Sequence, residues 1–240
     1  MKDTIFNKQN SIIGDFVFNK KVADVFNNMI NRSVPGYRSI ITMLGVLAQQ
    51  YIQAGTNCYD LGSSLGAGAI SIAKNIGQKK CSIIAVDNSL AMVGKCKANI
   101  KKQKLSRNIK VICDDLQSIK IENASMVVLN LTLQFVAPKM RKKIIKKIYN
   151  GMIASGVLFL TEKIAFKNKK ENDFQVKSYH TFKKLKGYTD LEISQKRTAL
   201  ENVLIPDTIA THKQRLKECG FSNVYIWFQC FNFVSMIAVK

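Results

Sequence analysis

The strongest constraint on the fold is a short segment in which an apolar run, residues 56–61, leads directly into a glycine-containing turn. The glycines are Gly62, Gly66 and Gly68, and residues 69–76 continue with the pattern of a helix. Glycine suits a turn in which the backbone takes unusual dihedral angles or lets a ligand approach closely. The segment therefore predicts a strand, a turn and a helix whose first N–H groups are free.

The spacing of these glycines differs from that of a dinucleotide-binding loop. Three residues separate Gly62 from Gly66, whereas the G-x-G-x-x-G fingerprint has one residue between its first two glycines. Asp60 precedes the first glycine, where its carboxylate would repel a pyrophosphate. A carboxylate there suits a ligand with a positive group, such as the amino group or sulfonium of S-adenosylmethionine. Taken alone, the segment also fits a tight turn in any α/β protein.

The rest of the chain alternates apolar runs with helical patterns. Short apolar runs at residues 81–86, 108–113, 124–129 and 156–160 are typical of buried parallel strands. Residues 224–228 and 231–239 are separated by a very short turn, which requires an antiparallel pair. We therefore expect an α/β fold with a doubly wound, mostly parallel seven-stranded sheet and an antiparallel edge strand.

All 240 residues are expected to form one domain with two helical additions. Residues 1–53 form an N-terminal helical lid, and residues 167–204 form a polar helical insertion. Pro138 is expected to open a helix whose basic residues face solvent, and Asp207 to cap a helix that ends at Glu218. These basic residues are Arg141, Lys142, Lys143, Lys146 and Lys147.

The formal net charge of +21 has two explanations. One is a nucleic-acid partner, because lysine and arginine neutralise phosphates. The other, which we favour, is a genome whose composition enriches lysine, since the basic residues are dispersed without interleaved aromatic side chains. Six cysteines without a C-x-x-C pair, with two histidines, make a metal site unexpected. With no signal sequence and no long apolar run, a cytoplasmic location is expected.

Polar residues follow four of the expected strands, at Gly62, Asp87, Asp115 and Asn130. Ligands of doubly wound sheets bind outside the carboxyl ends of the strands, so these residues are candidates for one site. Asp87 can accept hydrogen bonds from both ribose hydroxyls of an adenosine ligand, or it can cap the next helix, a role that Ser89 could share. Asp115 can bind an adenine amino group or stabilise a turn.

Several longer blocks resemble the carboxy-S-adenosyl-L-methionine synthase family, which has the class I S-adenosylmethionine-dependent methyltransferase fold. The resemblance extends over nearly the whole chain, and departs from the usual pattern at Ser63, where a cysteine is expected, and at residues 151–156. The blocks that carry it are residues 31–37, 59–66, 121–130, 191–197 and 227–233.

The resemblance implies that S-adenosylmethionine reacts with prephenate to give carboxy-S-adenosyl-L-methionine and phenylpyruvate. Prephenate would release carbon dioxide and hydroxide as its ring aromatises, the hydroxide would deprotonate the sulfonium methyl group, and the carbanion would capture the carbon dioxide. A separate enzyme would use the product for the uridine-5-oxyacetic acid modification of tRNA wobble uridine. The chain would form a homodimer, for which residues 167–204 are our candidate interface.

The resemblance also assigns the site residues. Arg197 would bind the transferred carboxylate in a bidentate manner and is the one expected catalytic residue. On spacing alone, Arg197 could equally be a surface residue paired with Glu192 or Glu201. The residues expected to contact the cofactor are Tyr37, Gly62, Ser63, Ser64, Asp87, Asn88, Asp115, Leu116, Asn130 and Arg197.

Two other functions remain open at this point. One is a methyltransferase that acts on a small molecule or on RNA. The other is a non-catalytic tRNA-binding partner, for which the net charge of +21 is the only indication. Direct tRNA binding is therefore not our expectation, although the charge keeps it as an alternative.

Overall fold

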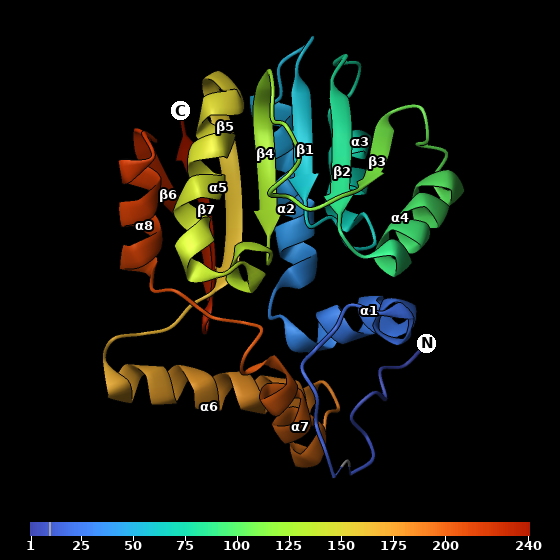
Figure 1. Ribbon diagram of the computed structural model, residues 1–240, viewed down its shortest axis with the longest axis vertical. Helices are drawn as coiled ribbons and strands as arrows, with labels where there is room; N and C mark the ends of the chain where they lie inside the picture. The colour runs from blue at the N-terminus through green and yellow to red at the C-terminus, as the bar shows by residue number, and fades with distance from the viewer. Residues whose placement is uncertain (10) are drawn as a thin grey trace.

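A computed structural model describes residues 1–9 and 11–240. Its centre is a seven-stranded sheet with the strand order β3-β2-β1-β4-β5-β7-β6, which confirms the expected doubly wound α/β fold (Figure 1). In this order, each strand from β3 through β2, β1 and β4 to β5 pairs in parallel with the next, whereas β7 is antiparallel to both β5 and β6. The strands are β1 (Asn57–Leu61), β2 (Ser82–Asp87), β3 (Ile109–Cys113), β4 (Ala124–Asn130), β5 (Met152–Lys163), β6 (Asn223–Cys230) and β7 (Phe233–Val239).

Helices cover both faces of the sheet. On one face lie α2 (Tyr37–Tyr51), α3 (Ala67–Asn75) and α4 (Leu90–Lys102), whose buried side chains join one apolar cluster. On the other face lie α5 (Pro138–Gly151) and α8 (Ile209–Glu218). In the described part of the chain, no helix is long and apolar enough to cross a membrane.

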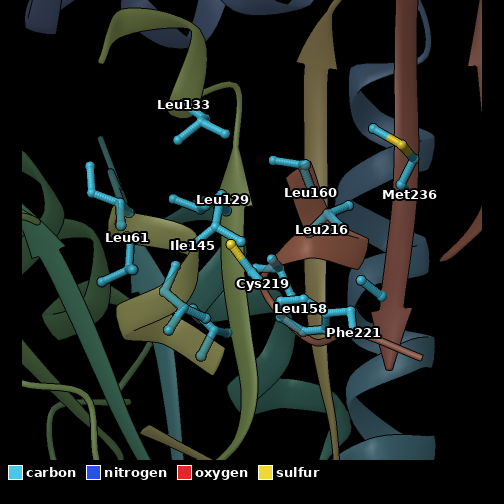
Figure 2. Close-up of a cluster of buried hydrophobic side chains, with 14 of the residues drawn as sticks. Leu61, Leu129, Leu133, Ile145, Leu158, Leu160, Leu216, Cys219, Phe221 and Met236 are labelled. Atoms are coloured by element: carbon cyan, nitrogen blue, oxygen red, sulfur yellow. The ribbon is translucent and has the colours of Figure 1, made fainter. Parts of the chain in front are cut away.

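Side chains alternate between the two clusters along each central strand, as the pleat requires. Leu129 of β4 and Leu158 of β5 point toward Ile145 of α5 and Leu216 of α8 (Figure 2). Their neighbours Val128 and Phe159 belong to the opposite cluster. Because both faces are buried, the strands contain nearly continuous apolar runs, and this explains why they could be recognised in the sequence.

Three further helices lie beyond the carboxyl ends of the parallel strands (Figure 1). They are α1 (Lys20–Ser33), α6 (Lys169–Leu185) and α7 (Asp190–Leu200). Arg32 of α1 donates a 2.7 Å hydrogen bond from Nε to the carbonyl of Lys186, and its guanidinium stacks 3.8 Å from the ring centroid of Tyr188. The backbone N–H of Phe16 donates to the carbonyl of Ala199 at 2.8 Å. The N-terminal segment and the residues 167–204 therefore hold each other at this end of the sheet.

Two expectations about single residues were wrong. Arg141 does not face solvent: it is fully buried and donates to the carbonyls of Val136, Gln134 and Ile205. Asp207 does not cap α8, because the side chain of Thr208 accepts the capping hydrogen bond. Instead, Asp207 pairs with Arg141 at 2.7 Å.

Candidate active site

The turn after β1 brings the carboxylate of Asp60 close to the backbone of α3. Gly62 and Gly66 have φ angles of 77° and 81°, in the left-handed region that favours glycine. Asp60 accepts a 2.9 Å hydrogen bond from the N–H of Ala69 in the first turn of α3. A Cβ at Gly68 would lie 2.8 Å from the Asp60 carboxylate, so glycine is needed for this close approach.

Asp60 is almost completely buried, with 2% of its surface exposed. Burial raises the pKa of its carboxyl to about 7, the hydrogen bond from Ala69 opposes this shift, and the charge of Asp87 adds to it. A buried carboxylate that lacks a basic partner is stabilised by a cationic ligand. That Asp60 favours a ligand with a positive group stays a prediction, and the burial of its carboxylate supports it.

Asp87 connects the ends of β1 and β2. Its Oδ2 accepts from the N–H of Ser64 at 2.8 Å, and its Oδ1 accepts from the N–H of Ser89 at 2.9 Å. Ser89 provides the cap of α4, since its hydroxyl accepts from the N–H of Met92 at 3.2 Å. Each carboxylate oxygen of Asp87 keeps a lone pair for a further donor. Burial raises the pKa of Asp87, and its two backbone donors oppose this shift.

The loop after β3 is stabilised by a lysine of α5. Asp115 accepts from the N–H of Gln117 at 2.7 Å, which closes the turn. Lys147 donates from Nζ to the carbonyls of Leu116, Gln117 and Ile119 at 2.7 to 2.9 Å. Lys147 was expected on the solvated face of its helix, and this third correction has a clear physical reason: the loop presents three carbonyls that need a donor.

At the end of β4, the buried Oδ1 of Asn130 has no hydrogen-bond partner in the described structure. The residues that follow form a tight turn, whose N–H groups at Thr132, Leu133 and Gln134 all donate to the fully buried carboxylate of Glu162. Burial raises the pKa of Glu162 to about 8, against the effect of these donors. The turn is thus fixed, and the orphaned Asn130 oxygen is available to a ligand donor.

These loops surround one cavity of about 380 Å³. Nine of the ten expected contact residues line it: Tyr37, Gly62, Ser63, Ser64, Asp87, Asn88, Asp115, Leu116 and Asn130. The opposite wall consists of apolar side chains from the N-terminal segment, including Phe16, Phe18, Phe26 and Met29. A volume of this size, with apolar walls and a few directed polar groups, is typical of a small-molecule site.

Arg197, the tenth residue, is not among the residues that line the cavity. It is exposed on α7, and within the described residues it forms no ion pair with Glu192 or Glu201. Burial lowers the pKa of Lys163 and of Lys183, and the charge of Arg197 adds to both shifts.

Sequence reasoning missed two basic residues that do line the cavity, Lys163 and Lys196. Lys163 ends β5, so its position after a fifth apolar run was a signal of the same kind as Asn130 after the fourth. Lys196 precedes Arg197 in a polar helix and gave no such signal, because its side chain is buried only by the packing of α7 against α1 and the N-terminal segment.

Comparison with known sequences gives the same picture of the fold. The family model of a methyltransferase domain matches residues 59–156, which span β1 to the first part of β5. Two relatives called carboxy-S-adenosyl-L-methionine synthase come from Actinobacillus pleuropneumoniae and Vibrio cholerae. The first is 51% identical over 239 residues, covering 100% of this chain and 99% of the relative. The second is 49% identical over 239 residues, covering 100% and 97%.

Solved structures share the fold at low sequence identity. Human N-acetylserotonin methyltransferase in complex with S-adenosylmethionine has a TM-score of 0.62 at 14% identity, covering 92% of this chain and 55% of that one. A Methanococcus maripaludis protein, described as a candidate S-adenosylmethionine-dependent methyltransferase, has a TM-score of 0.63 at 24% identity, covering 96% and 97%. With about half of all residues identical to these synthases from end to end, the chain belongs to the carboxy-S-adenosyl-L-methionine synthase family.

Proposed function

We propose that this protein converts S-adenosylmethionine and prephenate into carboxy-S-adenosyl-L-methionine and phenylpyruvate. The observation that carries the proposal is the division of the cavity into two electrostatic halves. Asp60 and Asp87 lie at the strand ends, where they suit a cation, whereas Lys163 and Lys196 line the side formed by the end of β5 and by α7. Methyl transfer to a neutral acceptor does not require the positively charged half of the cavity.

The strand-end residues fit S-adenosylmethionine. The backbone of residues 62–64 is open to the methionine portion, with Asp60 behind it as a counter-charge for a positive group. The free lone pairs of Asp87 suit the ribose hydroxyls, and Asp115 and Leu116 suit the adenine. The orphaned oxygen of Asn130 can accept from an ammonium or hydroxyl group of the ligand.

Arg197 is our candidate for the carboxylate of the product. In the present conformation its side chain lies outside the cavity wall, beside Lys163 and Lys183. Arginine side chains are long and flexible, and a bidentate contact with a carboxylate in a site of low dielectric constant is strong enough to draw one inward. Its role is therefore to bind the group that distinguishes the product from the substrate.

Two wider features belong to the same proposal. The product would serve a separate enzyme that modifies the wobble uridine of tRNA, so this chain would act on small molecules. The chain would also be a homodimer, with residues 167–204 at the interface. Phe174 and Leu185 of α6 support this, because they are 62% and 82% exposed and lie eleven residues apart, on one face of the helix.

Mass spectrometry of the cofactor tests the proposal and its alternative together. The protein is incubated with S-adenosylmethionine, with and without prephenate. Carboxylation increases the mass of the cofactor by about 44 units, the mass of carbon dioxide, and yields one phenylpyruvate per product in a site that stabilises anionic charge. Formation of S-adenosylhomocysteine with an added acceptor would support ordinary methyl transfer instead, and no mass increase with prephenate would contradict the proposal.

A further inference from the structure

Three lysines from three different elements meet at one side of the cavity. Lys163 ends β5, Lys183 lies in the last turn of α6, and Lys196 lies in α7. We call them the lysine cluster. Lys163 and Lys196 line the cavity directly, and so does Tyr179, whose ring centroid is 5.3 Å from Nζ of Lys163 and 4.7 Å from Nζ of Lys183. The ring of Tyr179 therefore contacts Lys163 and Lys183, whereas Nζ of Lys196 lies 5.4 Å from the ring centroid of another residue, Tyr188.

The lysine cluster has little negative charge to balance it. Among the described residues, neither Lys163 nor Lys183 forms an ion pair, and no hydrogen bond from either ammonium group to a protein atom is found there. Lys196 donates to the hydroxyl of Ser33 at 3.0 Å and lies 3.9 Å from the carboxylate of Asp3. Asp3 and Glu192 are thus the acids that act on the cluster, and both act on Lys196.

This imbalance is unusual because these lysines are removed from water. Lys183 and Lys196 are 5% and 7% exposed, whereas exposed lysines such as Lys142 and Lys184 do have carboxylate partners. Burying an ammonium group without a counter-charge is costly. A fold that keeps Lys183 and Lys196 buried near the cavity is therefore stabilised when an anion enters.

The titration behaviour agrees with this geometry. Burial, together with the charges of Lys196, Lys163 and Arg197, lowers the pKa of Lys183 to about 7. Burial also lowers the pKa of Lys196 to about 8, although Asp3 opposes the shift. The groups are therefore short of negative charge from the protein itself.

We propose that the lysine cluster is the binding site of the second substrate and selects a dicarboxylate with an apolar body. This inference rests on the proposed function and gives its anionic substrate a place. Lys163 and Lys196 approach the cavity from separate elements, so each can meet one carboxylate. The wall around them is formed by apolar side chains, which suit a hydrocarbon ring and not a small inorganic anion: Val34, Leu131, Tyr179 and Phe233.

The same residues indicate how the two ligands would lie relative to each other in the cavity. Asp60 and Asp87 lie at the strand-end side of this cavity, and the lysine cluster lies toward α6 and α7. A cationic cofactor and a dianionic substrate would therefore bind side by side with opposite charges facing each other. This arrangement brings the two reactants together without a protein side chain between them.

Calorimetric titration with matched ligands tests the inference without turnover. The full chain, saturated with S-adenosylmethionine, is titrated with phenylsuccinate and with 3-phenylpropionate, which differ by one carboxylate. The variants are Lys163→Met and Lys183→Met, and the control is Lys177→Met, an exposed lysine on the same helix α6. Each cluster variant should weaken phenylsuccinate binding by about tenfold or more, with little effect on the monocarboxylate and on S-adenosylmethionine.

Two further measurements distinguish a loss of ligand binding from a loss of folding in these variants. Thermal unfolding should show Lys183→Met at least as stable as the parent, because a like charge leaves a crowded site. The KM for prephenate should rise in the same variants by a similar factor. Equal affinity of parent and cluster variants for phenylsuccinate, or an equal loss in Lys177→Met, would overturn the inference. If dicarboxylates bind the cluster and no carboxylated product forms, the proposed reaction fails while the binding site stands.

Discussion

The carboxylate of Asp87 accepts the backbone N–H of Ser64 at 2.8 Å, so that the end of β2 fixes the turn that follows β1. The same carboxylate accepts from Ser89 at the start of α4. One side chain therefore positions two backbone segments of the cavity wall and still offers lone pairs to a ligand. Such a residue affects ligand affinity in two ways, by direct contact and by shaping the turn.

Replacement of Asp87 by alanine is therefore expected to weaken binding of S-adenosylmethionine by about 1–3 kcal/mol, the range for loss of two ribose hydrogen bonds. Isothermal titration calorimetry measures this directly. Glu122→Ala is the matched control, because Glu122 is an exposed carboxylate whose ion pair with Lys120 lies outside the cavity. An unchanged dissociation constant in Asp87→Ala would remove Asp87 from the site.

Arg141→Met tests the largest fully buried polar side chain of the described structure. The substitution leaves the carboxylate of Asp207 with Arg215 as its remaining partner at 2.6 Å, and it leaves carbonyls such as that of Val136 without a donor. Breaking a buried ion pair costs about 3–5 kcal/mol of the free energy of unfolding. Urea denaturation should show a loss of this size.

Lys142→Met is the control for Arg141→Met, since Lys142 is the next residue of α5 and its ion pair with Glu218 is exposed. Its effect on the free energy of unfolding should be small, as for other surface pairs. Similar losses in the two variants would show that the buried network of Arg141 is not the source of the stability.

The sheet and the strand-end residues were predictable because each depends on a local pattern. Apolar runs followed by glycine, aspartate or asparagine indicated β1, β2 and β4, and the topology then brings Gly62, Asp87 and Asn130 to one edge. Arg141 was not predictable, because helical spacing places it among solvated lysines. Its burial depends on carbonyls contributed by the chain between α7 and α8, which is distant in sequence.

The lysine cluster was even less predictable from the sequence than the burial of Arg141. Lys163, Lys183 and Lys196 are separated along the chain, and a sequence with a net charge of +21 gives no reason to single them out. Only the folded structure shows that Lys163 and Lys196 line one cavity and that Lys183 contacts the same tyrosine ring as Lys163. Charges that act together through tertiary contacts leave no periodic signal in the sequence.

Arg197→Ala is expected to separate product binding from substrate binding. If Arg197 binds the added carboxylate, the variant should lose about tenfold or more in affinity for carboxy-S-adenosyl-L-methionine and about as much in its rate of formation. Affinity for S-adenosylmethionine should change little. Arg107→Ala, at an exposed position after α4, serves as the control. An equal loss for both ligands would contradict the assigned role.

The stability of the protein should depend on Lys183 and on pH in a defined direction. The pKa of Lys183 is about 7 in the folded protein, against an ordinary value of 10.5 for lysine, so the unfolded chain binds more protons between these two values. The charged form of Lys183 destabilises the folded state, and this effect is complete below about pH 7. The free energy of unfolding therefore rises as the pH increases from about 7 to about 10. The charged groups facing it are Lys163 of β5 and Lys196 and Arg197 of α7.

Lys183→Met removes this penalty, so the variant should be stabilised relative to the parent at pH 6 and much less so at pH 9. A gain of about 1 kcal/mol corresponds to roughly 2–4 °C in Tm for a chain of this size. Differential scanning calorimetry at the two pH values, with Lys177→Met as the control, measures the difference. The opposite result, a variant that loses stability relative to the parent at pH 6 but not at pH 9, would show that the fold stabilises the ammonium group of Lys183.

The exposed apolar face of α6 gives a prediction about assembly. Phe174 and Leu185 lie on one face of this helix, and a contact across them would remove apolar surface from water in a homodimer. The double variant Phe174→Glu/Leu185→Glu places charges in that contact and should shift the protein to the monomer in sedimentation equilibrium. Leu90→Glu, at an 80% exposed leucine of α4, should leave the dimer intact. If both variants remain dimeric, the interface lies elsewhere, and if the parent itself sediments as a monomer, the proposed dimer is wrong.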